Sequence, residues 1–549
     1  MIMSIFYMIG SAIGGIGLFV LGMSLMSNGL KTASGSSLHH FLRHWTKTPF
    51  RGLSLGFVLT SLIQSSSAIT ITIIGFCNAG LLSLKRAAWV VFGSNVGTTT
   101  TGWIVALIGL NIKVSSFALP LIGIGMLLNL SKKNQKISGL GKALLGFGLL
   151  FLGITVLKDT FSDLSQLITF DNSGADASLA ELLLFLGIGF LITLLMQSSS
   201  VTLAITLTAL SGGVISLLGA AAVVVGGNLG TTSTAMIASF GTNAVAKRVV
   251  ASHLIFNLVS AVVTFIFLAP FVSLIVYGQQ QLFADNTSTT SLALFHTFFN
   301  ILGVVLIWPF VDALLKWLSQ QFKDDEEDSA KPLYLNKQSL NLPSLALHAL
   351  NKELERISQY ALNIAVDSIK LESISNTLKL KDQSIKKLIT ALGDYTSKLY
   401  KQNLSDDISN QLPAILRISQ YYNSISDLSI ILSQQKQFSE LAIDPNIQQE
   451  INNYLRQSVS LLNDLGLQKK LRSEKEIDNQ LTKLEINYQT IKALLLRRGA
   501  EGVLSIAKMD KKMNLISHVR RINQQAVKAY IHYIELELTY DVKLEKEAI

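Results

Sequence analysis

The tetrapeptide Gln-Ser-Ser-Ser occurs twice in this chain, at residues 64–67 and 197–200, each time inside a strongly apolar stretch. The two copies lie 133 residues apart, and the same offset aligns residues 57–101 with 190–234 without a gap. Twenty of those 45 aligned residues are identical, including a second shared string, Gly-x-Asn-x-Gly-Thr-Thr. A polar interruption that recurs in corresponding apolar segments is typical of transporters that bind their substrate between two structural repeats.

Charged residues divide the 549-residue chain into two parts. Residues 1–321 hold 15 Lys/Arg and 7 Asp/Glu, whereas the remainder holds 31 and 29. Long apolar runs with so few charges predict membrane spans of about 20 residues each. We therefore expect a transmembrane domain over 1–321, an acidic linker over 322–343 and a helical domain over 344–549. The single cysteine, Cys77, excludes an internal disulfide and any multi-cysteine metal site.

The distribution of Lys and Arg predicts how the chain is oriented in the membrane. Basic clusters at 31–51, 85–86, 132–142 and 247–248 are expected on the cytoplasmic side, and the acidic 159–181 loop outside. The resulting prediction places the N-terminus outside, the C-terminus in the cytoplasm and the spans at 4–27, 87–112, 114–131, 142–158, 214–245, 249–272 and 292–319. The first span is expected to be retained, because Met1–Met26 lacks a basic start and a small-residue cleavage site.

The two tetrapeptides fall on segments that are expected to enter and leave the membrane on one side. Residues 52–84 begin and end at basic clusters, so they predict a re-entrant hairpin from the inside, and residues 182–212 predict one from the outside. Repeat 1 (about 4–131) and repeat 2 (about 142–272) would then have opposite topology, with 292–319 as an extra span. The predicted fold is all-α, with inverted repeats, re-entrant hairpins and helices that break within 87–112 and 214–245.

The repeated strings supply groups that suit both anions and small cations. A broken helix presents free N–H groups to an anion and free carbonyls to a cation. Serine and threonine hydroxyls donate to oxyanion oxygens or accept toward a hard cation such as sodium, and a Gln amide does either. The expected helix-break residues are Gly93, Asn95, Gly97, Gly226, Asn228 and Gly230. The aligned stretches 57–101 and 190–234 contain no acid and no His, which favours sodium over protons as a coupling ion.

Packing is the competing interpretation of these strings. One serine-rich stretch in a membrane helix is more often a packing device or a hydroxyl bonded back to its own helix. Glycines alone are equally consistent with close contacts between helices. The duplication of both strings at one offset favours a binding site, because packing does not require the same polar sequence in both halves. No nucleophile–base or metal-ligand group lies in the repeats, so an enzyme is not expected.

At these residues the chain resembles the type II sodium–phosphate cotransporter family, over roughly residues 10–310. The resemblance implies sodium-coupled movement of inorganic phosphate, with Na+ as the coupling ion. It implies phosphate contacts at Gln64, Ser65, Ser66, Gln197, Ser198 and Ser199. It implies sodium ligands at Ser67, Ser200, Thr98, Thr99, Thr231 and Thr232. Some family members carry an Asp shortly after the first Gly-rich segment, and residues 93–113 here contain no acid.

The C-terminal part shows helical periodicity beyond Pro343. Apolar residues at 3/4 spacing predict five or six antiparallel helices: Leu347, Leu350, Leu354, Ile357, Ala361 and Ile364, then Ile415, Ile418, Tyr422 and Ile425. The strings 353–360 and 416–421 resemble the repeated helices of PhoU-type phosphate regulators. That family's metal-binding acids are replaced here by Gln359, Gln420 and Leu416. We therefore expect no metal site, and a plain helical bundle is an equal alternative.

The sequence thus predicts a multi-pass plasma-membrane protein, of the bacterial inner-membrane kind, that transports phosphate with sodium by alternating access. Two alternatives stay open: net phosphate export, and a phosphate sensor that signals through the PhoU-like domain. The expected partners are phosphate, sodium and the lipid bilayer, with a homodimer or a regulatory protein bound through the cytoplasmic domain. Nucleic acid is not an expected partner, because basic residues interleaved with aromatics are absent.

Overall fold

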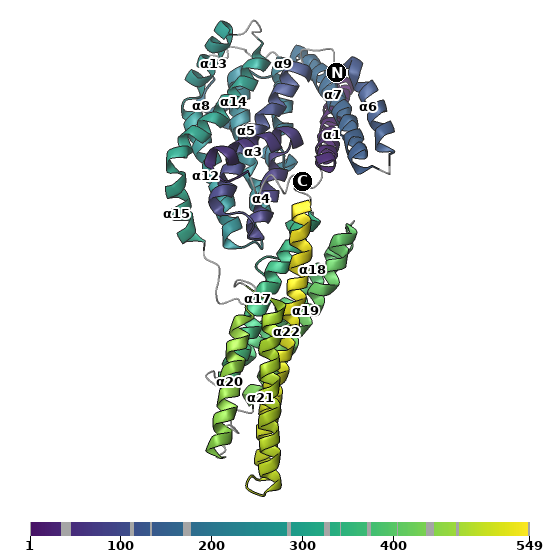
Figure 1. Cartoon of the computed structure of the whole chain (residues 1–549). Helices are drawn as coiled ribbons and strands as arrows, with labels where there is room; N and C mark the ends of the chain where they lie inside the picture. The colour runs from purple at the N-terminus through teal and green to yellow at the C-terminus, as the bar shows by residue number, and fades with distance from the viewer. Residues whose placement is uncertain are drawn as a thin grey trace. The chain divides into compact units, whose positions relative to one another are not determined.

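The computed structural model describes residues 2–34, 45–109, 115–131, 134–167, 177–282, 287–322, 330–340, 342–370, 375–402, 404–434, 444–467 and 472–546. Nearly all of these residues are helical, and none of them forms a β-strand (Figure 1). The chain separates into two compact units. The N-terminal unit comprises residues 1–77 and 81–323, and the C-terminal unit comprises residues 78–80 and 324–549.

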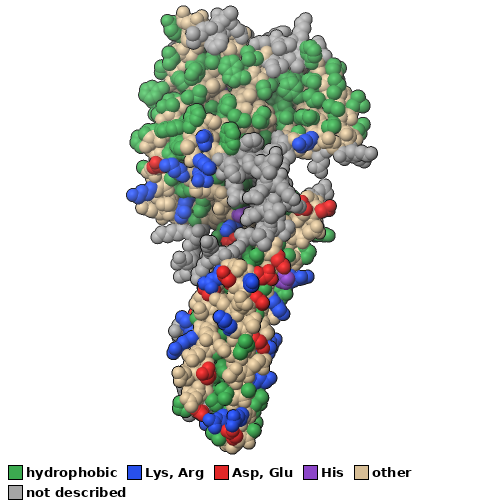
Figure 2. All heavy atoms as spheres, viewed as in Figure 1, with side chains coloured by type: hydrophobic (Ala, Val, Ile, Leu, Met, Phe, Trp, Pro, Cys, Tyr) green, Lys and Arg blue, Asp and Glu red, His purple; other side chains and the backbone are tan. Residues whose placement is uncertain are grey.

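Six helical segments of the N-terminal unit are long and apolar enough to cross a membrane, counted over the described residues. They are Phe6–Ala33, Lys136–Ser165, Leu179–Met196, Leu217–Ala238, Ala244–Ile266 and Ser288–Gln321. Five of the seven expected spans coincide with one of these helices. The expected spans 87–112 and 114–131 do not, and the expected hairpin arm Leu179–Met196 does qualify by length. Apolar side chains cover the face of this unit that Figure 2 shows.

Two 33-residue helices, α1 (Ile2–Ser34) and α7 (Gln135–Leu167), pack side by side through glycines. A Cβ added to Gly22 would lie 2.6 Å from the Gly146 carbonyl oxygen, and one added to Gly29 would lie 2.5 Å from that of Gly139. Gly15 likewise faces Gly153. The contacted glycines rise in number along α1 and fall in number along α7, so the two helices are antiparallel. Small residues at the contact allow this close approach, as in membrane helix pairs generally.

The repeated stretches form two matching sets of helices. The first set is α3 (Pro49–Ile63), α4 (Ser66–Asn78) and α5 (Leu84–Trp103), and the second is α8 (Leu179–Met196), α9 (Ser199–Ser211) and α10 (Leu217–Gly230). Thr48 caps α3 ahead of Pro49, and Ser178 and Glu181 form a capping box at the start of α8. The other helices of this unit are η1 (Ile104–Gly109), α6 (Ser115–Asn129), α11 (Thr232–Ala238), α12 (Ala244–Ile266), α13 (Leu268–Leu282), α14 (Ser288–Ile307), η2 (Trp308–Phe310) and α15 (Val311–Gln321).

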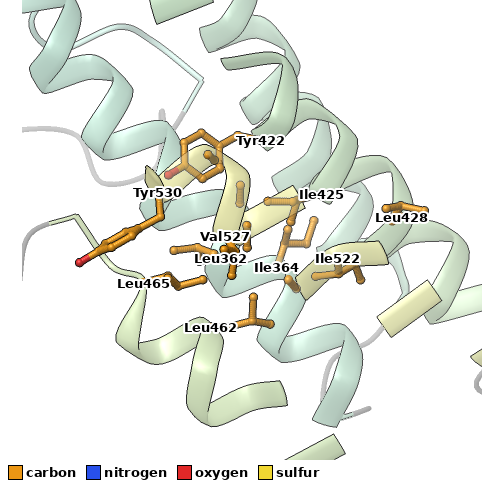
Figure 3. Close-up of a cluster of buried hydrophobic side chains, with 14 of the residues drawn as sticks. Leu362, Ile364, Tyr422, Ile425, Leu428, Leu462, Leu465, Ile522, Val527 and Tyr530 are labelled. Atoms are coloured by element: carbon orange, nitrogen blue, oxygen red, sulfur yellow. The ribbon is translucent and has the colours of Figure 1, made fainter. Parts of the chain in front are cut away.

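The C-terminal unit is a bundle of long helices. They are α17 (Pro343–Lys370), α18 (Ser375–Tyr400), α19 (Asp406–Gln434), α20 (Pro445–Asp464), α21 (Glu474–Ala500) and α22 (Ile506–Lys546), preceded by the short α16 (Lys337–Leu340). Side chains from α17, α19, α20 and α22 meet in its core (Figure 3). The apolar residues singled out by their 3/4 spacing from Leu347 to Ile364 and from Ile415 to Ile425 are buried there, so that prediction is confirmed. Gln359 and Gln420 are exposed.

A buried ion pair ties the segment before the bundle to α17. The Glu353 carboxylate is fully buried and accepts hydrogen bonds from the backbone N–H groups of Leu333 and Tyr334, both at 2.9 Å. Arg356 donates to Glu353 at 2.8 Å and to the Lys331 carbonyl at 2.7 Å. Burial raises the pKa of the Glu353 carboxyl, while the backbone donors and Arg356 oppose that effect. The pair therefore fixes residues 331–334 against the bundle.

Replacing Glu353 with alanine should release this segment. Two backbone N–H groups lose a charged acceptor, a bond worth about 1.5–3 kcal/mol. Amide hydrogen exchange at Leu333 and Tyr334 in the full-length protein should therefore accelerate by roughly tenfold or more. Glu450→Ala, at an exposed position of α20, is the matched control and should leave both amides unchanged. Unchanged exchange in Glu353→Ala would show that the ion pair does not hold the segment.

Candidate functional site

Each tetrapeptide forms a sharp turn between two helices, and the turn residue is the glutamine. Gln64 has φ 58° and ψ 31°, and Gln197 has φ 53° and ψ 28°. Among the described residues these are the non-glycine residues with positive φ. The left-handed conformation costs an L-residue about 1–2 kcal/mol, and such strain concentrates at functional sites. Finding it at the same position of both copies marks these turns as candidates for function.

Around both turns, equivalent glycines contact equivalent residues of the neighbouring helix. A Cβ added to Gly93 would lie 2.0 Å from the Leu53 carbonyl oxygen, and one added to Gly226 would lie 1.9 Å from that of Leu186. Gly97 and Gly230 face Phe57 and Phe190 in the same way. Helices α3 and α5 are thus parallel, and so are α8 and α10, with the same 40-residue offset. The intervening helices α4 and α9 must then run back, so each tetrapeptide lies at the tip of a helical hairpin.

The sequence predicted that the helices break at both Gly-rich strings, and the structure shows a break in the second copy alone among the two. Helix α5 runs without interruption through Gly93, Asn95 and Gly97, and changes to a π-helix only at Ile104. In the second copy the helix stops just after Gly230 and restarts at Thr232. None of the four motif glycines has positive φ. The motif glycines are conformationally ordinary, and their lack of a side chain is used for close packing between helices.

The first hairpin tip is buried and connects to the second copy. The Gln64 side chain donates through Nε2 to the Ser61 carbonyl and accepts through Oε1 from Thr101 Oγ1 at 2.9 Å. The same Thr101 hydroxyl lies 3.4 Å from Ser200 Oγ. Ser65 Oγ accepts from the Ala68 N–H at 3.2 Å and thereby caps α4. Thr101 therefore brings the two repeated segments together.

The second tip is arranged differently. The Gln197 side chain is exposed, whereas Gln64 is 6% exposed. Behind the tip the hydroxyls of Thr193 and Thr202 lie 2.7 Å apart. The two halves therefore match in backbone but differ in how closed their tips are.

The motif threonines point their hydrogens into their own helices. The hydroxyls of Thr98 and Thr99 donate to the carbonyls of Ser94 and Val96, and those of Thr231 and Thr232 donate to the carbonyls of Asn228 and Leu229. A hydroxyl that donates its hydrogen to a carbonyl still offers its oxygen lone pairs to a cation or to another donor. All four side chains are buried.

A small cavity lies beside the first tetrapeptide. The gap between its atoms is about 180 Å³ in all but too narrow for a water molecule, so a ligand fits only when the lining residues move apart; these are Ser66, Ser67, Thr70, Thr231, Ala235 and His253. Serine and threonine from both repeated segments therefore face the same space as a histidine from α12. Within the part of the chain that the structure describes, no Lys, Arg, Asp or Glu belongs to this lining. A ligand there would be held by hydroxyls, by the imidazole and by the N-terminal turn of α4.

The motif asparagines meet on a third asparagine that sequence reasoning missed. Asn95 Nδ2 and Asn228 Nδ2 both donate to Asn257 Oδ1, at 2.6 and 3.2 Å. The His253 imidazole completes the group, with Nε2 at 3.0 Å from Asn257 Nδ2 and at 3.2 Å from Asn95 Oδ1. Asn95 and Asn228 therefore join α5 and α10 to α12 and do not bridge the two halves of a broken helix.

The structure brings together five of the twelve predicted phosphate and sodium ligands. Gln64 and Ser200 are joined through Thr101, and Ser66, Ser67 and Thr231 line one cavity. Gln197 takes no part in either group. His253 and Asn257 come from outside the aligned stretches, so the absence of histidine from those stretches does not describe the assembled site. A His and an Asn one turn apart in the apolar Ala244–Ile266 helix were the available signal, because intramembrane polar residues are commonly functional. In the described residues, no three His, Cys, Asp or Glu side chains gather as a metal site.

The fold and this centre define a multi-pass, all-helical membrane protein with a neutral polar site between two similar sets of helices. The family model described as "Na+/Pi-cotransporter" matches residues 18–159 and 178–280. The chain belongs to the Na+/Pi-cotransporter family, a family of transporters.

Curated relatives cover different shares of the chain. The "Putative inorganic phosphate export protein YjbB" of Escherichia coli (strain K12) is 25% identical over 92% of this chain and 94% of its own length. The "Uncharacterized protein YqeW" of Bacillus subtilis is 31% identical over 53% of this chain and 91% of its own length. The "Sodium-dependent phosphate transport protein 2A" of Rattus norvegicus is 34% identical over 17% of this chain and 15% of its own length. No solved structure matches the chain.

Proposed function

We propose that this protein moves inorganic phosphate across the membrane together with sodium, by alternating access. The observation that carries the proposal is the convergence of the two tetrapeptides, since Thr101 contacts both Gln64 and Ser200. A duplicated polar site at the meeting point of two similar helix sets suits a substrate held between repeats. Family membership and the names of the relatives support phosphate and sodium as the transported species.

The chemistry of the centre fits an anion bound together with a small cation. Serine hydroxyls and the first turn of α4 donate hydrogen bonds to phosphate oxygens, for which we propose Gln64, Ser65, Ser66, Gln197, Ser198 and Ser199. Oxygen lone pairs coordinate sodium, for which we propose Ser67, Ser200, Thr98, Thr99, Thr231 and Thr232. Because the cavity lining carries no formal charge, the two ions are expected to neutralise each other there.

The helix packing supports an inverted arrangement of the two repeats. Helices α1 and α7, which precede the two hairpins, are antiparallel, whereas the hairpins themselves share one internal register. Equivalent elements of opposite direction are what an inverted repeat requires. We propose a bacterial inner-membrane location with the N-terminus outside and the C-terminal unit in the cytoplasm. Alternating access then exposes the centre to one side at a time.

Direction of flux is set by the gradients and by regulation. Relatives matched over 92% of this chain carry the name of a phosphate exporter, which favours net export as the second candidate. We propose that the C-terminal unit, as a PhoU-like bundle, regulates the transporter or binds a regulatory partner. Deleting residues 331–549 separates a transporter, which would retain flux, from a sensor, which would lose its phenotype.

Uptake into proteoliposomes tests the proposed function. Reconstituted protein should accumulate labelled phosphate faster with sodium than with potassium outside. Ser66→Ala removes a hydroxyl that lines the cavity and should lower sodium-dependent uptake by about tenfold, as expected for the loss of a hydrogen bond to a charged ligand. Ser65→Ala and Ser198→Ala should lower uptake as well. Ser162→Ala, at an exposed position of α7, is the control. Wild-type uptake that ignores sodium would contradict the coupling.

A further inference from the structure

A second repeated motif lies outside the aligned stretches. The string His-x-x-Phe-Asn occurs at His253–Asn257 on α12 and at His296–Asn300 on α14. Both histidines are 3% exposed, and Nδ1 of each has no hydrogen-bond partner. A buried polar nitrogen without a partner costs about 1–3 kcal/mol. Two such nitrogens at matching motif positions therefore call for a functional explanation.

The surroundings of the two histidines are related by the same 133-residue offset as the tetrapeptides. His253 shares its cavity with Ser66, Ser67, Thr70, Thr231 and Ala235. The counterparts of these residues are Ser199, Ser200, Leu203, Thr98 and Gly102. A Cβ added to Gly102 would lie 3.7 Å from His296 Nδ1 and 3.0 Å from Leu203 Cδ2. The histidines thus occupy equivalent places, and the lining differs in that Thr70 beside His253 becomes Leu203 beside His296.

Hydrogen bonds around Asn257 favour one of the two neutral tautomers of His253. Asn257 Oδ1 accepts from Asn95 and Asn228, so its Nδ2 is the atom turned toward the imidazole. The shorter contact of His253 Nε2 is the one to Asn257 Nδ2, at 3.0 Å. An amide N–H that donates to Nε2 requires that nitrogen to be unprotonated, which leaves the proton of a neutral imidazole on Nδ1. In this tautomer the unpartnered Nδ1 is a hydrogen-bond donor, whereas a proton on Nε2 would be donated to Asn95 Oδ1 at 3.2 Å and would leave Nδ1 an acceptor.

Among the described residues, the polar side chains that share the cavity with His253 are those of Ser66, Ser67, Thr70 and Thr231. Thr70 Oγ1 is also buried without a partner. Helix α4 begins at Ser66, so its first N–H groups lie at the same place. A donor imidazole, the hydroxyls of Ser66, Ser67 and Thr70 and a helix N-terminus together suit an oxyanion.

We infer that His253 is a further ligand of the transported oxyanion, donating a hydrogen bond from Nδ1 while Asn257 holds its tautomer. His296, beside Leu203, is its structural counterpart and does not bind the anion. The inference rests on the proposed function for the identity of the oxyanion as phosphate. It adds a residue from α12 to a site otherwise built from the two repeats.

Two substitutions of His253 separate its two nitrogens. The amide of asparagine reaches the position of Nδ1, and that of glutamine reaches the position of Nε2. In full-length protein reconstituted with sodium, His253→Gln keeps a partner for Asn257, loses the Nδ1 donor and should raise KM for phosphate at least tenfold, with a smaller change in Vmax. His253→Asn should retain a KM closer to wild type. His296→Gln, equally buried, should change KM less than twofold. A wild-type KM in folded His253→Gln, or an equal effect in His296→Gln, would overturn the inference.

The tautomer provides a readout that does not depend on transport. Nitrogen-15 NMR of protein labelled at histidine, with His253 assigned from the signal that His253→Gln removes, should show a protonated Nδ1. That signal should shift when inorganic phosphate and sodium are added. Sulfate and arsenate are added in parallel samples. A shift with sulfate or arsenate but not phosphate would refute phosphate as the substrate and keep His253 as an anion ligand. A proton on Nε2, or no shift with any of the three anions, would refute the role of His253.

Discussion

Replacing Gly226 with alanine is expected to abolish phosphate transport and to destabilise the N-terminal unit. The new Cβ would lie 1.9 Å from the Leu186 carbonyl oxygen, so helices α8 and α10 must separate along their length. Overpacking of a close-packed interior costs about 1–3 kcal/mol or more, and here the obstacle is backbone that cannot rotate away. Thermal unfolding of the purified protein and sodium-dependent uptake measure the two effects. Gly93→Ala, whose Cβ would lie 2.0 Å from the Leu53 carbonyl oxygen, should likewise lower the unfolding temperature and abolish uptake.

A matched glycine lies on helix α8 itself. Gly187 has no heavy atom within 4 Å of an added Cβ, so Gly187→Ala should retain wild-type stability and uptake. Equal stability of Gly226→Ala and Gly187→Ala would show that the close approach of α8 and α10 is not needed. Loss of function in both variants would instead point to a general sensitivity of these helices to alanine.

Replacing Asn257 with alanine is expected to have the second large effect. The substitution leaves the buried amides of Asn95 and Asn228 without their acceptor and His253 without its donor. Each buried polar group left without a partner lowers the stability by about 1–3 kcal/mol. The melting temperature should therefore fall, and uptake should drop by more than tenfold. Asn257→Asp, which keeps an acceptor oxygen in place of Oδ1 but removes the Nδ2 donor, tests whether acceptance alone restores the fold.

Asn300 provides the control for Asn257. It occupies the same motif position on α14 and is 1% exposed, yet its side chain donates to the His296 carbonyl of its own helix at 2.9 Å. Asn300→Ala should therefore lower the melting temperature much less than Asn257→Ala. Equal losses in the two variants would mean that burial of any asparagine here matters more than the three-way contact.

Sequence periodicity predicted the helical character of both units and the core of the C-terminal bundle, because apolar spacing of 3 and 4 residues has one simple solution in a helix. The duplicated tetrapeptides also identified the turns that converge on Thr101. The left-handed backbone of Gln64 and Gln197 was not predictable, since glutamine has no preference for that conformation.

Two features were misread for physical reasons. The Gly-x-Asn-x-Gly string was interpreted as a helix break in both copies. The second copy does break, between Gly230 and Thr232, yet Gly93 and Gly97 lie in a continuous α5, where close packing between helices offsets the poor helix propensity of glycine. His253 and Asn257 escaped notice because they lie outside the aligned residues and reach the site only through the packing of α12 against α5 and α10. Tertiary contacts of this kind are not encoded in any local pattern.

Phosphate binding stoichiometry tests most directly whether the two tetrapeptides form one site. Isothermal titration calorimetry of the purified full-length protein in sodium should give one phosphate per chain, and binding should weaken strongly in potassium. Ser66→Ala and Ser199→Ala, one in each copy, should both weaken that same single binding event. Two phosphates per chain, with each substitution removing one of them, would contradict a shared site, and equal affinity in potassium would contradict the coupling to sodium.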